Sequence, residues 1–142
     1  MALPALDNLV RTGGLKSEPA EQVELDGLIR SGLARLDDAA NTTLSLDGRF
    51  DLAYNAAHAL SLAALRWHGY RSENRYLVFQ TLAHTLSLPS EQWRVLDAAH
   101  RKRNFVEYEG VADVDEEIVA ALIRVTREVA ARVRKLGPVP KD

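Results

Sequence analysis

Apolar residues recur at intervals of three and four positions along most of the chain, the spacing that places side chains on one face of an α-helix. Five stretches follow this pattern, and no convincing strand is found. The pattern predicts helices over about 17–40, 47–68, 72–86, 89–110 and 114–137. Short connections between long helices favour antiparallel neighbours. We therefore expect an all-α fold, an up-and-down helical bundle of four core helices plus one additional helix.

Residues with capping chemistry stand at the expected helix starts. Ser17 and Ser72 are good N-caps, because a hydroxyl accepts a hydrogen bond from a free backbone N–H. Asp113, with Glu116 three residues later, resembles a capping box. At the other end of the last helix, Gly137 is followed by proline and is expected to stop it. These signals agree with the boundaries that the periodicity predicts.

The chain divides into one domain with short ends. Residues 1–16 contain Pro4 and Gly13-Gly14, so we expect an extended or flexible lead-in there. Residues 17–137 are predicted to form a single helical domain, followed by a tail over 138–142. A chain of 142 residues is long enough to bury one substantial core.

Composition excludes several classes of protein. Hydrophobic residues make up 46% and charged residues 27% of the chain, which is typical of a soluble globular domain. The absence of cysteine removes disulfides and thiolate metal sites, and it fits a reducing cytoplasm. No uncharged apolar run reaches the roughly 20 residues that a membrane span needs. We expect a cytoplasmic protein without a membrane partner.

Charge is uneven along the chain although the net charge is only -2. Residues 16–51 contain eight acidic and four basic residues, whereas residues 66–103 contain seven basic and three acidic ones. Two interpretations stay open, because linear clustering need not survive folding. The basic residues either form a solvated surface paired with the acidic first helix, or they form a patch that faces phosphate.

Short catalytic and metal-binding motifs are missing. The sequence has no Gly-rich phosphate loop, no serine nucleophile elbow and no histidine pair with metal-ligand spacing. We expect neither a cofactor nor a metal. His58 follows Tyr54 by about one helical turn and is interpreted as a hydrogen-bonded residue at the edge of the core. His84 is interpreted as structural as well.

The end of the fourth predicted helix has unusual polar chemistry. Leu96, Ala99, Arg103 and Val106 are spaced three, four and three apart, so Arg103 falls on or beside the apolar stripe. A guanidinium keeps its proton, and burying it without a partner is costly. Arg103 therefore needs a carboxylate, a carbonyl or a bound anion. A structural ion pair with Glu107 or Asp97 is one alternative, and a ligand site is the other.

A second polar line runs beside Arg103. His100, Asn104 and Tyr108 are four residues apart and lie above one another on the helix. Together with Arg103 and Glu107 they bring a cation, an imidazole, an amide, a phenol and a carboxylate to one helix end. The spacing predicts a cluster that can bind or position a ligand.

This region resembles a known family. The segment "AHRKRNFVEYEG" (99–110) is similar to the signature region of the HEPN superfamily, an all-α domain, and "AYNAAHALSLAALRWHGYR" (53–71) resembles its second helix. The layout over 25–136 also fits that domain. The family motif is an arginine, often followed by a polar residue, and then a histidine. Arg103 and Asn104 match its start, while Tyr108 stands where the histidine is expected.

The resemblance implies a role for each residue of the cluster. HEPN proteins include metal-independent ribonucleases, many of them toxins of toxin–antitoxin pairs, with sites formed between two protomers. On this basis Arg103 binds the scissile phosphate, Asn104 orients it, and the RNA 2′-hydroxyl is the nucleophile. Tyrosine titrates near ~10 and imidazole near ~6.5, so Tyr108 is a poor base. His100 or Glu107 is then the candidate substitute.

Three functions follow from these observations. The first is a HEPN-like module that binds nucleic acid or a partner in a groove around Arg103, Asn104 and Tyr108. The second is a metal-independent ribonuclease toxin, and the third is a structural all-α dimer without a ligand. The candidate catalytic residues are Arg103, Tyr108 and His100, with Asn104 and Glu107 as substrate-binding residues. The partners implied are a second copy of the chain, RNA and a nucleotidyltransferase-like antitoxin.

Overall fold

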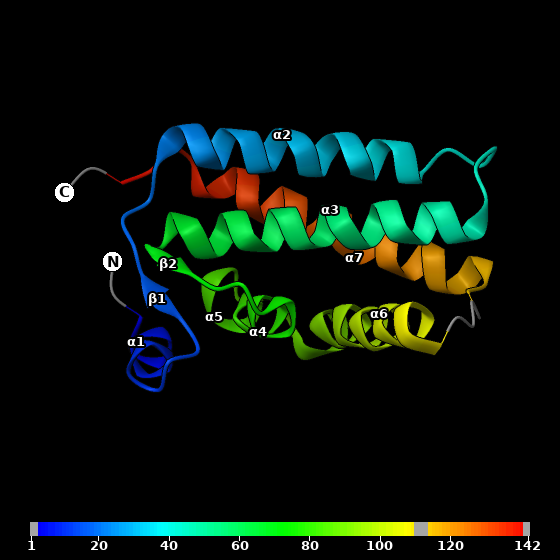
Figure 1. Cartoon of the computed structure of the whole chain (residues 1–142). Helices are drawn as coiled ribbons and strands as arrows, with labels where there is room; N and C mark the ends of the chain where they lie inside the picture. The colour runs from blue at the N-terminus through cyan, green and yellow to red at the C-terminus, as the bar shows by residue number, and fades with distance from the viewer. Residues whose placement is uncertain (1–2, 110–113, 141–142) are drawn as a thin grey trace.

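The fold is an all-α bundle, as the periodicity predicts (Figure 1). The computed structural model describes residues 3–109 and 114–140, with the side chains of 105–109 left out of the description. Over these residues the elements are α1 (Pro4–Arg11), β1 (Lys16–Ser17), α2 (Gln22–Ala39), α3 (Leu46–Trp67), β2 (Tyr70–Arg71), α4 (Arg75–Gln80), α5 (Leu82–Thr85), α6 (Ser90–Glu109) and α7 (Glu116–Leu136). The long helices α2, α3, α6 and α7 alternate in direction along the chain (Figure 1).

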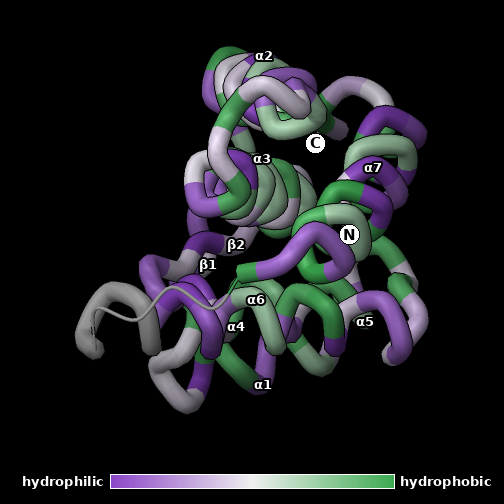
Figure 2. The backbone as a smooth tube through the Cα atoms, turned by 90° about the vertical axis from the view of Figure 1, so that its right-hand side faces the viewer, coloured by the Kyte–Doolittle hydropathy of each residue, from purple (hydrophilic) through white to green (hydrophobic). Residues whose placement is uncertain are grey.

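Helix α3 lies at the centre of the bundle. Viewed end on, it sits between α2 on one side and α4 and α6 on the other, with α7 beside it (Figure 2). Its contacts with α2 are the most extensive between any two elements. A β-carbon added to Gly32 of α2 would lie 2.7 Å from Cγ of Leu60, so only glycine allows these two helices to approach so closely. The core is thus built around α3. Helices α4 and α6, which contribute residues to the candidate site, both pack against α3.

The prediction of an extended lead-in is wrong for its first part. Residues Pro4–Arg11 form helix α1, whose Leu6 is completely buried against Leu65, Tyr70 and Val78. Pro4 stands in the first turn, where its fixed φ and missing N–H suit a helix start. A helix of eight residues is too short to be stable by propensity alone. Its packing on α3, β2 and α4 therefore supplies most of its stability.

Two expected helix starts are displaced by a short strand pair. Ser17 is not an N-cap, because it lies in β1 and pairs antiparallel with Tyr70 of β2, and α2 begins only at Gln22. Ser72 is also not the cap of the next helix. Its hydroxyl donates to the carbonyl of Gly14, while Asn74 caps α4 through its side-chain oxygen. The prediction that no strand exists is therefore wrong for residues 16–17 and 70–71.

Two further details differ from the predicted helices. The stretch 72–86 forms two helices, because the chain turns at Thr81, whose hydroxyl donates to the carbonyl of Val78 at 2.7 Å. The last helix is capped by Asp115, which accepts from the N–H of Ile118 at 2.9 Å. The predicted cap Asp113 lies outside the described residues. Both cases show side-chain oxygens competing for backbone groups, which spacing alone does not resolve.

A buried arginine joins the end of α3 to α2 and to the strand pair. The side chain of Arg66 is only 1% exposed, and its Nε donates to the carboxylate of Glu24 at 2.7 Å. Its two terminal nitrogens donate to the carbonyls of Glu18 at 2.9 Å, Pro19 at 2.8 Å and Tyr70 at 3.3 Å. Arg71, one third exposed, adds ion pairs to Glu18 and Glu24. The guanidinium of Arg66 thus links α3 to both strands and to α2.

The carboxylates of this network titrate accordingly. A hydrogen bond from Arg71 lowers the pKa of Glu18. Burial works to raise the pKa of Glu24, but hydrogen bonds from Arg66 and Arg71 outweigh it and hold that pKa below its usual value. Both groups therefore stay ionised at neutral pH. Of the basic residues in 66–103, Arg66 and Arg71 fit the interpretation of charges paired with acidic residues near the first long helix.

We predict that Arg66→Met lowers the free energy of unfolding by about 3 kcal/mol, because it removes the donor to three backbone carbonyls and leaves Glu24 with Arg71 as its remaining arginine partner. Arg71→Met is the matched control, since Arg71 contacts the same carboxylates from a solvated position and is expected to cost less than about 1 kcal/mol. Urea unfolding at neutral pH measures both values. Equal losses for the two variants would contradict the central role of Arg66.

Candidate functional site

Three helices converge on the ring of Tyr54. This tyrosine of α3 is completely buried, and its ring packs edge-on against Phe79 of α4 with the centroids 5.7 Å apart. His100 of α6 stacks on it at 6.2 Å. The helical spacing of α3 places His58 one turn further along, where its ring contacts Phe79 at 6.2 Å. We call the residues gathered around this ring the Tyr54 cluster; its polar members are Tyr54, Asn55, His58, Arg75, Tyr76, His100, Arg103 and Asn104.

Two guanidinium groups face the same aromatic ring. The Cζ atom of Arg103 lies 4.8 Å from the Tyr54 ring centroid, and that of Arg75 lies 5.6 Å from it. Each distance is within the range of a cation–π interaction. Arg75 also donates from Nη1 to the side-chain oxygen of Asn55 at 3.1 Å, which is a neutral partner. Two cations from different helices therefore contact the same ring.

The hydroxyl of Tyr54 is satisfied by His100. Its oxygen lies 2.8 Å from Nδ1 of His100, and Nε2 of the same ring lies 3.2 Å from Nδ2 of Asn104. A neutral imidazole donates from one nitrogen and accepts at the other. If the amide of Asn104 donates to Nε2, then Nδ1 carries the proton and donates to Tyr54. Both ring nitrogens are therefore engaged within the protein.

Both histidines of the cluster are neutral at pH 7. Burial lowers the pKa of His100; Asp97 opposes this shift, and the charges of Arg103 and Arg75 reinforce it. Burial also lowers the pKa of His58 to about 4, helped by the charges of Arg75, Arg103 and His100. The two arginines thus carry the positive charge of the cluster, while the imidazoles act as hydrogen-bonding and stacking groups.

Acidic side chains border one side of the cluster. Arg103 lines a small pocket together with Asp47, Phe50, Asp51 and Val114. Both aspartates are exposed, and they lie at the start of α3. Asp97 of α6 pairs with Arg101 at 2.7 Å. An anion would therefore meet the least repulsion on the side of Arg75 and His100, away from the two aspartates.

The structure brings together three of the five candidate site residues. Arg103, His100 and Asn104 lie in the Tyr54 cluster and are all partly buried. The prediction that Arg103 lies beside the buried stripe of Leu96 and Ala99 is confirmed. The predicted stacking of His100 and Asn104 is confirmed as well. The side chains of the other two candidates, Glu107 and Tyr108, lie outside the described residues, as does that of Val106.

Sequence reasoning missed the residues that α3 and α4 contribute. Tyr54 and Tyr76 were not predicted to belong to a site, and Tyr76 is 38% exposed with its ring centroid 5.7 Å from that of His100. Arg75 was one of several basic residues without an assigned place. The signal available was the basic run in the middle of the chain. It could not show that Arg75 and Arg103 reach the same ring, because that depends on how α4 and α6 pack on α3.

The two remaining histidine interpretations differ in outcome. His58 lies at the edge of the core as expected, but its Nε2 is buried and has no hydrogen-bond partner among the described residues, so the predicted hydrogen bond is wrong for that atom. His84 is exposed on α5. The described part of the chain has no group of three or more His, Asp or Glu residues able to hold a metal ion. Within the same residues, no helix is long and apolar enough to cross a membrane.

Comparison of the chain with family models, with curated proteins and with solved structures finds no match. The similarity to the HEPN superfamily therefore stays a prediction that rests on the sequence segments alone. The chemistry of the Tyr54 cluster has to carry any functional conclusion.

We predict that stability falls as the pH drops from about 6.5 towards 4, in part because of His58. In the unfolded chain this imidazole takes up a proton near its ordinary pKa of ~6.5, whereas in the folded protein it does so only at about 4. Protons therefore favour the unfolded state in this window. His58→Phe, which keeps a ring against Phe79, should flatten the decline and leave stability at pH 7 unchanged or higher.

Urea unfolding at several pH values between 7 and 4 measures the slope for both proteins. His84→Phe is the matched control and should retain the wild-type slope, because His84 is exposed. A variant at position 58 whose slope equals that of the wild type would refute this assignment.

Proposed function

We propose that the Tyr54 cluster binds single-stranded RNA by contacting the phosphates and bases of the RNA. The observation that carries the proposal is the convergence of Arg75 and Arg103 on one buried ring, where the hydrogen-bond acceptor described for Arg75 is the neutral side chain of Asn55. An extended anion that reaches both guanidinium groups is attracted by both positive charges. A phosphodiester segment supplies such an anion, and guanidinium groups bind phosphate oxygens in a fork geometry.

Arg103 can bind a phosphate and contact protein groups at the same time. Its guanidinium has five N–H donors, so contacts with neighbouring carboxylates do not exhaust it. The ring of Tyr54 holds the planar group from one side at 4.8 Å. This contact limits the positions that the guanidinium can adopt, and preorganisation lowers the entropic cost of binding.

The surroundings of the two arginines favour a nucleic acid strand over a small anion. Tyr76 is exposed at the edge of the cluster, beside the ring of His100. Exposed aromatic rings next to cations are the usual platform on which bases of a single strand stack. The amides of Asn55 and Asn104 add groups that can pair with base edges. Duplex recognition would need a more extended basic surface, and Asp47 and Asp51 interrupt the basic surface here.

Metal-independent cleavage is the second candidate, and one observation favours it. His100 is held neutral by burial, as a base that accepts the 2′-hydroxyl proton must be. Against it, both nitrogens of this ring already take part in hydrogen bonds with Tyr54 and Asn104. Proton transfer would require the Asn104 contact to break. Binding is therefore the function we place first, with Arg103 and His100 as the residues that cleavage would use.

Two parts of the proposal rest on the HEPN resemblance alone. They are a homodimer whose groove holds the site and a nucleotidyltransferase-like antitoxin partner. A location in the cytoplasm is proposed from the absence of cysteine. Tyr108 and Glu107 enter the proposal in the same way, as residues of the groove next to Arg103. Sedimentation of the purified chain tests the dimer directly.

We predict that Arg75→Ala and Arg103→Ala each weaken the binding of a fluorescein-labelled oligouridine about tenfold, because each removes one guanidinium from the phosphates. The slope of log affinity against log salt should fall by about 0.7 in each variant, because one fewer phosphate is neutralised. Tyr76→Ala should weaken binding with no change in that slope, because stacking carries no charge. Fluorescence anisotropy at several salt concentrations measures all three variants.

Arg101→Ala is the matched control on the same helix, since Arg101 is exposed and pairs with Asp97. It should bind like the wild type. Incubating the oligouridine with EDTA and examining it on a gel tests cleavage, which His100→Gln should abolish if that ring is the base. If Arg103→Ala lowers the melting temperature while RNA affinity stays unchanged, the arginine serves packing only and the proposal fails.

A further inference from the structure

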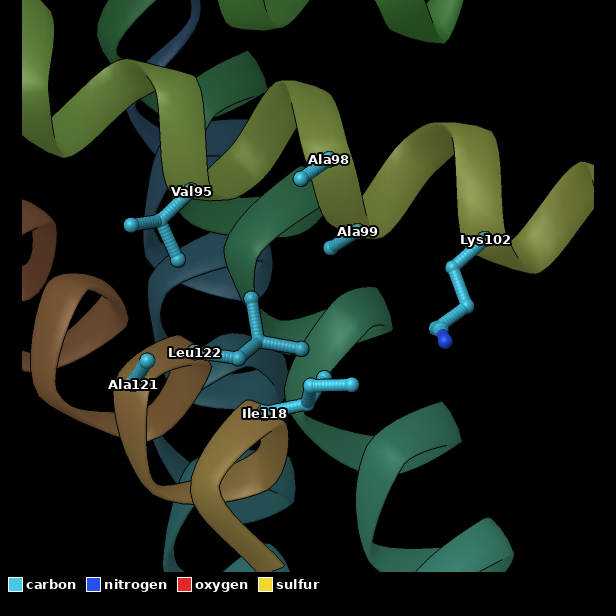
Figure 3. A pocket seen from close by; sticks show the side chains of 7 residues that line it. All are labelled: Val95, Ala98, Ala99, Lys102, Ile118, Ala121 and Leu122. Carbon is cyan, nitrogen blue, oxygen red and sulfur yellow. The ribbon is translucent and has the colours of Figure 1, made fainter. Parts of the chain in front are cut away.

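A groove on the other side of α6 has a different chemistry. It runs between α6 and α7 and is lined by Val95, Ala98 and Ala99 from α6 and by Ile118, Ala121 and Leu122 from α7 (Figure 3). Lys102 lines one end of it (Figure 3). The lining is apolar apart from this lysine, and Ala98 is exposed to solvent. Apolar concave surfaces of this kind mark sites where another molecule docks.

The size of the lining residues indicates what shape fits. Ala98 and Ala121 stand on facing helices and have only a methyl group, so the backbone of a third helix can come close between α6 and α7 (Figure 3). Val95, Ile118 and Leu122 provide larger side chains that a row of apolar residues can pack against. An amphipathic helix that places its apolar stripe in the groove is the recognition mode that suits this surface.

The charges beside the groove indicate which helix fits. Arg94 lies one turn before Ala98 on α6, and Arg124 lies one turn after Ala121 on α7; both are exposed. Because α6 and α7 are antiparallel, the two arginines lie on opposite sides of the groove at the same end, away from Lys102 (Figure 3). Glu91 and Glu117 lie further along the two helices towards opposite ends. Carboxylates on both flanks of the docked stripe would complement the two arginines.

The neighbouring carboxylates do not neutralise these arginines. Asp97 pairs with Arg101 at 2.7 Å, and Glu128 pairs with Arg132 at 2.9 Å.

We propose that the α6–α7 groove docks an amphipathic helix of a partner protein whose apolar stripe is flanked by glutamate or aspartate. The proposal is independent of RNA binding, because the groove and the Tyr54 cluster lie on different faces of α6. The partner helix packs its small and branched residues over Ala98 and Ala121, and its carboxylates pair with Arg94 and Arg124.

A designed peptide tests this proposal. The probe is a labelled helix of about 18 residues, five turns, with leucine and alanine on one stripe and glutamate on both flanks. A second peptide replaces each glutamate by lysine. With the full chain, the glutamate peptide should bind saturably in fluorescence anisotropy, and the lysine peptide should bind at least about tenfold more weakly.

Matched variants locate the binding surface. Ala121→Glu should weaken binding of the glutamate peptide about tenfold or more, whereas Ala131→Glu, at an exposed position of α7 two turns beyond Arg124, should leave it unchanged. The double variant Arg94→Glu/Arg124→Glu should reverse the preference towards the lysine peptide. Circular dichroism melting checks that the variants fold, and Ala98→Glu replaces Ala121→Glu if the latter does not.

Three results would overturn the proposal. The first is no binding of the glutamate peptide, or equal binding of both peptides. The second is a concentration-dependent dimer in sedimentation that Ala121→Glu disrupts, which would make a second copy the occupant. The third is binding to vesicles of anionic phospholipid that Ala121→Glu abolishes, which would make a membrane surface the occupant.

Discussion

The guanidinium of Arg66 determines how the C-terminal end of the central helix connects to the rest of the molecule. Because a buried guanidinium keeps its charge, the chain has to surround it with acceptors. Glu24 and the carbonyls of Glu18, Pro19 and Tyr70 meet that requirement. Satisfying one side chain therefore fixes the strand pair, the start of α2 and the exit of α3 relative to one another. The chain reaches α4 only four residues after β2, so the position of Arg75 against Tyr54 depends on the same contacts.

The Tyr54 cluster combines a buried hydroxyl that is hydrogen-bonded, which favours stability, with two positive charges beside one ring. A buried phenol needs a hydrogen-bond partner, and His100 provides it, so the cluster contributes to the packing of α3 against α6. Two arginines beside the same ring raise the local positive potential, which stability alone does not favour. Natural proteins retain such arrangements mainly at functional sites. Nε2 of His58 fits the same pattern, because it is buried without a hydrogen-bond partner among the described residues and such a polar atom calls for an explanation.

Helical periodicity predicted much of the fold and part of the site, for identifiable reasons. Arg103, His100 and Asn104 lie on one helix, so spacing alone could place them relative to each other and to Leu96. Arg66 and Arg75 depend mainly on partners far away in sequence, among them the carbonyls of Glu18 and Pro19, and the identity of a residue does not reveal which side chain its carbonyl will bind. Helix α1 was missed because eight residues with a proline and two following glycines have little helical tendency by themselves. The split of 72–86 was missed because the hydroxyl of Thr81 competes for a backbone carbonyl.

Helix α6 explains how one small domain can present two unrelated surfaces. Residues three and four apart share a face, so His100 and Arg103 look towards α3 while Ala98 and Lys102 look towards α7. Leu96 and Ala99 lie buried between these two faces and hold the helix against the core. A packed helix transmits displacement as a rigid body, because its interior contacts leave little room for local adjustment. Any molecule that shifts α6 from the groove side must therefore also move the arginine and the imidazole that contact Tyr54. The two surfaces therefore differ in chemistry, but a displacement of α6 changes the positions of both.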